Sequence, residues 1–214
     1  MSPERATKTP FQLIDLLEAS EEELRTLADK IQAKSGFLQV LVHPFYDDGV
    51  RFSTQYENYK IRRDRFISAC LNHNIPLVIF EEEDKLDTLK DRLPKDISCP
   101  IFVVMTESTT PVPYGNHDMN SVIQLLRKIR AKKVCVGGQY MYVGRMVNSK
   151  EPYPGLYDKL RWTREANKVP CRWIDASISP YGCAGGVAVD LYLERFQVVL
   201  SFTSYPENMS RFVK

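Results

Sequence analysis

The segment 181–186, Tyr-Gly-Cys-Ala-Gly-Gly, is the part of the chain best suited to chemistry. The apolar pattern that follows predicts a helix, so Cys183 would lie in its first turn with Gly182, Gly185 and Gly186. A thiol at the positive end of a helix dipole has a lowered pKa and can act as a nucleophile, while helix-terminal amides can stabilise an oxyanion. The same amides could bind an anion without covalent chemistry. The glycines could also serve only close helix–sheet packing, and the sequence leaves these three interpretations open.

A candidate base lies far away in the sequence, at His43, which ends an apolar run and precedes Pro44. An imidazole near a crevice can accept a proton from a thiol or from water. Asp47 and Asp48 follow, and their carboxylates could orient such a base, hold magnesium or bind ribose hydroxyls. A structural histidine and an ordinary Asp-Asp-Gly turn are the alternative interpretations. The sequence thus predicts Cys183, His43 and Asp47 as catalytic candidates.

Three further groups could bind a ligand. Gly137 and Gly138 end one apolar run, Asp175 follows another, and Tyr140 lies near the start of an irregular segment, 139–182, that could close over a site as a lid. Aromatic rings and arginines in that segment would suit an anionic or aromatic ligand, or a subunit interface. The sequence contains neither the glycine pattern of dinucleotide-binding loops nor that of P-loops, and its five cysteines do not have zinc-binding spacing. We therefore expect no cofactor and no metal.

Strands of a mainly parallel sheet would position these residues. Six short apolar runs alternate with helical periods, which is typical of a three-layer α/β fold with helices on both faces of the sheet. In such folds ligands bind beyond the carboxyl ends of the strands, where His43 and Gly138 would lie. The predicted strands are 37–43, 76–80, 100–105, 134–138, 171–175 and 196–202.

Two helices are predicted ahead of this pattern. Residues 9–12, Thr-Pro-Phe-Gln, and residues 20–23, Ser-Glu-Glu-Glu, both have capping-box spacing. We expect residues 1–35 to form a helical arm, packed on the main domain, which is favoured, or on a partner subunit. Residues 36–214 would then form a single α/β domain.

Charge gives little support for a polyanion partner. The 214 residues carry 29 basic and 27 acidic side chains, a formal net charge of +2, and the signs are mixed along the chain. The acidic run 81–84 is predicted to be the exposed start of a helix and the basic run 127–133 the end of another, since both suit the helix dipole. Nucleic-acid binding through Arg62, Arg63, Arg65 and the run 127–133 is a minor alternative.

The expected compartment follows from apolar segments and cysteines. The first residues lack the apolar core of a signal peptide, and no stretch approaches the roughly 18 to 20 apolar residues of a membrane span. Five widely spaced cysteines do not suggest a disulfide framework. We expect a cytoplasmic protein with a small-molecule ligand and no membrane partner, which could form homo-oligomers through its N-terminal arm.

The order of elements resembles that of the isochorismatase-like cysteine hydrolases. In that family a parallel α/β domain has a cysteine at the start of a helix that leads into a further strand, as Cys183 and the run 196–202 would here. The resemblance implies hydrolysis by Cys183, with the family's aspartate falling at His43 or, displaced, at Asp47. Residues 106–108, Thr-Glu-Ser, stand where the family has its lysine. We therefore expect a cysteine-type hydrolase of a small anionic or amide-containing metabolite; a noncatalytic metabolite-binding or assembly module is the alternative.

Overall fold

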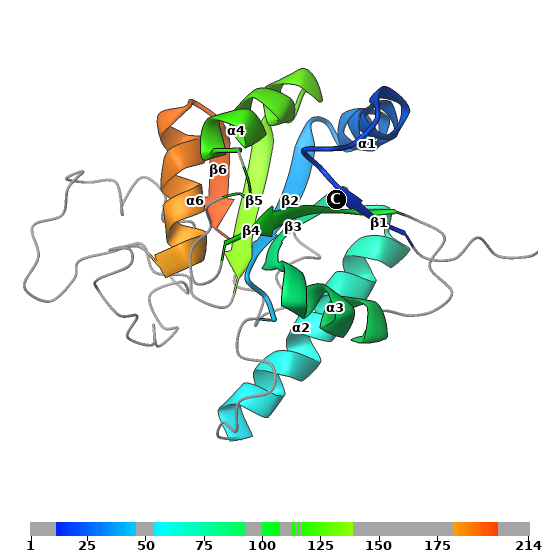
Figure 1. Cartoon of the computed structure of the whole chain (residues 1–214), viewed down its shortest axis with the longest axis vertical. Coiled ribbons are helices and arrows are strands. Elements are labelled where there is room, and N and C mark those ends of the chain that lie inside the picture. The colour runs from blue at the N-terminus through cyan, green and yellow to red at the C-terminus, as the bar shows by residue number, and fades with distance from the viewer. Residues whose placement is uncertain are drawn as a thin grey trace, which may run out of the picture.

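The computed structural model describes residues 12–45, 54–92, 100–107, 113, 115, 117–138 and 182–200. They form a six-stranded sheet in the order β1-β4-β3-β2-β5-β6, in which every strand pair is parallel (Figure 1). The strands are β1 (Leu13–Asp15), β2 (Phe37–Val42), β3 (Leu77–Glu82), β4 (Ile101–Thr106), β5 (Lys133–Gly138) and β6 (Gln197–Leu200). The helices are α1 (Glu21–Ala33), α2 (Thr54–Asn72), the 3-10 helix η1 (Glu83–Lys85), α3 (Leu86–Arg92), α4 (Met119–Lys128) and α6 (Gly182–Leu193). The predicted α/β fold with a parallel sheet is confirmed.

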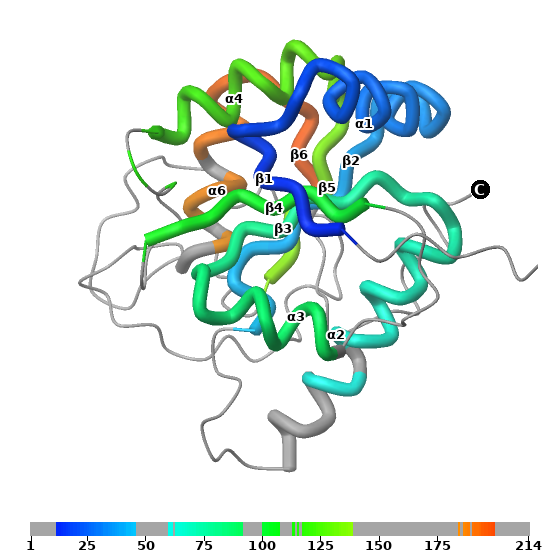
Figure 2. The backbone as a smooth tube through the Cα atoms, turned by 45° about the vertical axis from the view of Figure 1, so that its right-hand side comes forward, coloured from blue at the N-terminus to red at the C-terminus, as the bar shows by residue number. Residues whose placement is uncertain are grey.

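Alternate residues of the strands fill two separate cores. Val40 and Val42 of β2 belong to a cluster that includes apolar residues of α1, α4 and α6. Leu41, between them, belongs to a second cluster with residues of α2 and α3. Figures 1 and 2 both show α2 and α3 on one side of the sheet and the other three helices on the opposite side. Burial on both faces explains why the strands read as continuous apolar runs.

The start of the described chain differs from the prediction. Leu13–Asp15 form β1, which pairs with β4, so the helix expected to follow residues 9–12 is wrong over these positions. The ladder continues through bonds from Ile101 N to the Gln12 carbonyl and from Leu16 N to the Val103 carbonyl. A short helix is marginal by itself, whereas pairing with a buried neighbour strand satisfies these backbone groups. With β1, the described sheet has six strands, one of which was not predicted. The predicted strand 171–175 lies outside the described residues.

The second N-terminal helix agrees with the prediction. Ser20 caps α1 by a capping box with Glu23, in which each side chain bonds the backbone N–H of the other residue. Leu24, Leu27 and Ile31 are buried and belong to the first core. Helix α1 therefore packs on the sheet through its apolar face. No helix in the described part of the chain is long and apolar enough to cross a membrane.

The prediction that the acidic run 81–84 is the exposed start of a helix is wrong for Glu81 and Glu82 and agrees with the structure for Glu83 and Asp84. β3 continues to Glu82 because β4, its neighbour, runs to Thr106, and the two residues are paired in register. Glu81 is fully buried in the strand and Glu82 nearly so, and the helical part begins only at Glu83. The basic end of α4 agrees better, since Arg127 and Lys128 form its last turn.

Four helices end with the same backbone turn, which delivers the chain into the next strand. In each, a residue in the left-handed region is followed by an amide that bonds a carbonyl five residues earlier, as in a Schellman motif. The left-handed residues are Ser35 (φ 57°), Asn74 (51°), Arg130 (60°) and Arg195 (68°), and the bonds run from Gly36 to Ile31, Ile75 to Cys70, Ala131 to Leu126 and Phe196 to Leu191. Among the described non-glycine residues, His43 also has a positive φ, of 46°, but it follows a strand.

Candidate functional site

The strand order places a topological switch point between β2 and β5. From β2 the chain moves through β3 to β4 on one side, and from β5 it moves to β6 on the other. Ligands of open α/β sheets bind at such a point, beyond the carboxyl ends of the two strands. Here those ends are Val42 and Gly138, which face each other in register, and α6 begins at the same edge (Figure 1). This β2–β5 edge is the candidate site.

Gly138 is required for the close packing of this edge. A β-carbon at Gly138 would lie 2.2 Å from the Val42 carbonyl oxygen and 3.0 Å from the Ala184 Cβ. Ala184 is in the first turn of α6, directly after Cys183. Because Gly138 has no side chain, the first turn of α6 can pack closely against the ends of β5 and β2. The structure thus gathers Gly138, the start of α6 and the residue that follows Val42, His43.

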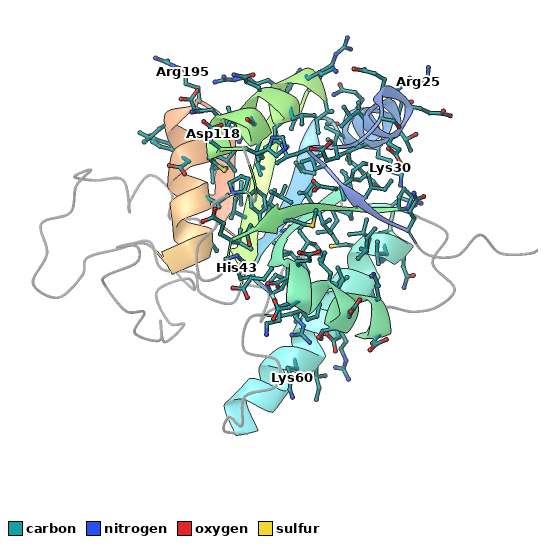
Figure 3. All side chains as sticks on the ribbon, in the orientation of Figure 1. Arg25, Lys30, His43, Lys60, Asp118 and Arg195 are labelled. Carbon is teal, nitrogen blue, oxygen red and sulfur yellow. The ribbon has the colours of Figure 1, made fainter. Side chains whose placement is uncertain are left out.

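His43 is held in a specific orientation at this edge. It is fully buried, and its backbone N–H donates to the Phe80 carbonyl at 2.8 Å. Its left-handed backbone turns the ring toward β4, where His43 Nε2 and Thr106 Oγ1 share a hydrogen bond of 2.9 Å (His43 is labelled in Figure 3). Burial lowers the pKa of His43 to about 4, so the ring is neutral at neutral pH. Left-handed backbone in a non-glycine residue is a local strain that the surrounding contacts must maintain.

We expect the buried His43 to make the fold sensitive to acid. Its pKa in the folded protein is lowered from 6.5 to about 4, so protons favour the unfolded chain over that range. The stability that neutral His43 provides is complete above pH 6.5 and is lost as the pH falls to about 4, with a slope of roughly 1 kcal/mol per pH unit. Urea unfolding from pH 7 to pH 4 should show this slope as the difference between the wild type and His43→Gln, because Glu81, whose pKa burial raises to about 8, contributes the same opposing slope in both proteins. His73→Gln is the control, because His73 is exposed; equal slopes in all three proteins would refute the assignment.

Glu81 lies one strand away, at the carboxyl end of β3. Its Oε2 accepts a hydrogen bond from the Phe45 N–H at 2.8 Å, and its Oε1 accepts one from the Glu82 N–H at 3.1 Å. Burial is the main effect on this carboxyl and, against the two backbone N–H groups, raises its pKa to about 8. Glu81 is therefore mainly protonated at neutral pH and joins the chain leaving β2 to the end of β3.

Arg63 of α2 holds the same stretch of chain from the other side. Its Nη1 donates to the Pro44 carbonyl at 3.0 Å, and its Nε and Nη2 reach Asp64 Oδ1 at 2.9 and 2.8 Å. Its guanidinium carbon lies 4.0 Å from the centroid of the Phe45 ring, a cation–π contact. Because Arg63 is fully buried, it cannot contribute to a nucleic-acid surface.

The basic end of α4 has protein partners as well. Arg127 pairs with Glu194 at the end of α6, and Lys128 pairs with Glu21 of α1. Exposed pairs of this kind contribute little to stability, but they explain these two bases without a polyanion.

Some of the predicted site residues lie where they were expected, and others lie outside the described residues. Gly137 and Gly138 end β5 as expected, and Gly182, Cys183, Gly185 and Gly186 lie in the first half of α6. Asp47, Tyr140 and Asp175 lie outside the described residues, as does nearly all of the irregular segment 139–182. Within the described ranges, no group of three or more metal-ligating side chains comes together.

Two charged residues near the site, Arg63 and Glu81, were not predicted from the sequence to lie there. Arg63 stands three, four and seven positions before Phe66, Ile67 and Cys70, so the helical period already placed it on the buried face of α2. Glu81 stands two and four positions after Ile79 and Leu77, and so shares their face of β3. In both cases the helix or strand periodicity indicated a buried position, but the residue was expected to be exposed because it is charged.

Two open grooves in the described part of the chain lie along α4. One, of about 430 Å³, is lined by polar residues from Asp118 to Arg127 and by Glu194. The other, of about 500 Å³, lies between α1 and the end of α4. Neither includes a residue of the β2–β5 edge. Comparison with protein-family models, with curated proteins and with solved structures finds no match for the chain.

Proposed function

We propose that the protein is a cysteine-type hydrolase of a small anionic or amide-containing metabolite, with its site at the β2–β5 edge. The close approach at Gly138 is the observation that carries the proposal, because it sets the first turn of α6, which contains Cys183, at the switch point of the sheet. The switch point alone, or a cysteine in the first turn of a helix alone, would be weak support for a hydrolase. Together they support the proposal, because Cys183, the proposed nucleophile, and the amides of its helix turn would then lie where α/β sheets bind ligands.

The reaction would be an acyl transfer through the Cys183 sulfur. The thiolate would attack the carbonyl carbon of the substrate, and the amides of the first turn of α6 would donate to the oxyanion that forms. The amine or alcohol would leave after taking a proton from water, and a second water would then hydrolyse the thioester, which releases the carboxylic acid and restores the Cys183 thiolate. The resemblance to isochorismatase-like hydrolases is consistent with this scheme.

His43 is a poor choice for the base in this reaction. A base with a pKa of about 4 takes a proton from a thiol only at a large free-energy cost. The hydrogen bond with Thr106 also commits Nε2 to a neighbour within the sheet. The helix dipole would therefore supply the thiolate, and the role of His43 would be to shape the edge of the site as a neutral ring.

The burial of His43 also favours a second candidate function. A noncatalytic module would use the same edge and the same helix-terminal amides to bind a carboxylated or phosphorylated metabolite. It needs no base and no reactive thiol. The two candidates therefore differ in the chemistry of Cys183.

Alkylation by iodoacetamide tests the proposal. If the hydrolase proposal holds, Cys183 reacts rapidly at pH 6–7, because its thiolate is present well below the usual thiol pKa of about 8.5. Peptide mass spectrometry gives the rate at each cysteine, and Cys183→Ser should remove the fast site. Cys70 and Cys135 are internal controls, since both are buried and should be labelled only after unfolding.

The hydrolase proposal is wrong if Cys183 is alkylated at the rate and pH midpoint of an ordinary thiol. Binding of inorganic phosphate that Cys183→Ser leaves unchanged would then support the noncatalytic module.

A further inference from the structure

A buried carboxyl group, that of Glu81, is one of the attachments that hold the chain leaving β2 to the sheet. Phe45 is fully buried in the second core, and its N–H donates to Glu81 Oε2 at 2.8 Å. The other oxygen of Glu81 accepts from its neighbour Glu82 in the same strand. Glu81 is therefore the side chain that links the end of β3 to the backbone just past His43.

The charged groups around Glu81 do not compensate its charge. From its own strand, Glu82 disfavours ionisation, and from η1 Lys85 favours it as the weakest of the effects. On β4 the residue in register is Met105, which is uncharged. From α2, Arg63 directs its guanidinium to Asp64 and to the Pro44 carbonyl. His43, from the β2 end, is neutral at neutral pH.

Two opposing effects therefore act on this group. Both carboxyl oxygens accept backbone N–H groups, which suits the ionised form, while full burial disfavours it. The ionised form regains favourable hydration only if water reaches it, which requires the Phe45 segment to move away. Ionisation and opening are thus linked.

We propose that Glu81 is a proton-operated latch: in its neutral form it holds the Pro44–Phe45 segment against β3, and its ionisation favours opening of that segment at the edge of the sheet. The latch does not depend on the function proposed above. It would make the start of the β2–α2 connection, next to the candidate site, more open in mildly alkaline solution.

The expected pH range follows from linkage. In the closed state the pKa of Glu81 is about 8, and after opening it returns toward its ordinary value of 4.5. The closed state is therefore fully favoured below pH 4.5 and is weakened as the pH rises to about 8. The opening equilibrium should increase about tenfold per pH unit in this range and level off above it.

Hydrogen exchange of the Phe45 amide in the full chain tests the latch. NMR would give its protection factor, corrected for intrinsic exchange, between pH 5.5 and pH 8.5. We expect a fall of about tenfold per pH unit up to pH 8, with little dependence on added urea because the opening is local. Val134, buried in β5 between β2 and β6, reports global unfolding and should be better protected and strongly urea-dependent.

Two variants complete the test. Glu81→Gln should give a Phe45 protection factor that no longer changes with pH, whereas Glu83→Gln, the same change at an exposed position of η1, should behave as the wild type does. The proposal is overturned if wild-type Phe45 protection is constant from pH 5.5 to 8.5. It is also overturned if Phe45 exchanges only with the protection and urea dependence of Val134. The wild-type series decides both points even if Glu81→Gln does not fold.

Discussion

Replacing Gly138 by alanine is expected to destabilise the protein by about 3 kcal/mol or more. The new β-carbon would lie 2.2 Å from the Val42 carbonyl oxygen, a separation that real β-carbons do not show. Overpacking usually costs about 1–3 kcal/mol, and there flexible side chains can move aside. Here the obstacle is backbone of the central strand, so β2 and β5 must separate at their carboxyl ends. Urea unfolding monitored by circular dichroism would measure the loss.

Two further variants make the result specific. Gly115→Ala adds the same methyl group where nothing lies within 4 Å, so only the strain of its left-handed backbone, roughly 1 kcal/mol, should appear. Ala184→Gly removes the second obstacle, 3.0 Å away, but should not rescue Gly138→Ala, because the Val42 oxygen stays. Equal losses at Gly138 and Gly115 would contradict the close approach that carries the proposed function.

The same glycine shows what the sequence could and could not predict. The apolar run before Gly138 and the helical pattern after Gly182 were sufficient to place one at a strand end and the other at a helix start. Their proximity depends on the strand order, which places β5 beside β2. Local patterns carry no information on which strands become neighbours, so the contact with Val42 could not be predicted.

Local patterns also failed where tertiary contacts decided the outcome. Thr9 and Gln12 have the spacing of a helix start, yet Leu13–Asp15 pair with β4, because strand partners are absent from any local pattern. Glu81 looked like an exposed helix start because it begins a run of acids. Its burial depends on β4, in which Met105 is in register with it, and on the chain that follows β2, where Phe45 bonds its carboxyl group.

Removing the buried guanidinium of Arg63 is the second change with a large expected effect. Deleting one partner of a buried ion pair typically costs about 3–5 kcal/mol, and since the Asp64 side chain is 27% exposed we expect about 3 kcal/mol for Arg63→Ala. Arg65→Ala is the matched control, because Arg65 is exposed on the same helix and should change stability by less than about 0.5 kcal/mol. Thermal and urea unfolding at pH 7 would measure both. Similar losses in the two variants would mean that Arg63 does not hold the chain after β2.

Conservative variants of Arg63 separate its three contacts. Arg63→Lys keeps a charge but loses the planar group that reaches Asp64, Pro44 and the Phe45 ring together, so it should recover only part of the loss. Arg63→Met keeps much of the packing on Phe45 without the charge. Arg63→Ala should lower the protection of the Phe45 amide at every pH, whereas ionisation of Glu81 lowers it only as the pH rises. The pH dependence of the Phe45 protection factor could be the same in Arg63→Ala as in the wild type while the protection factor itself is lower. That result would show that Arg63 and the protonation of Glu81 stabilise this segment independently.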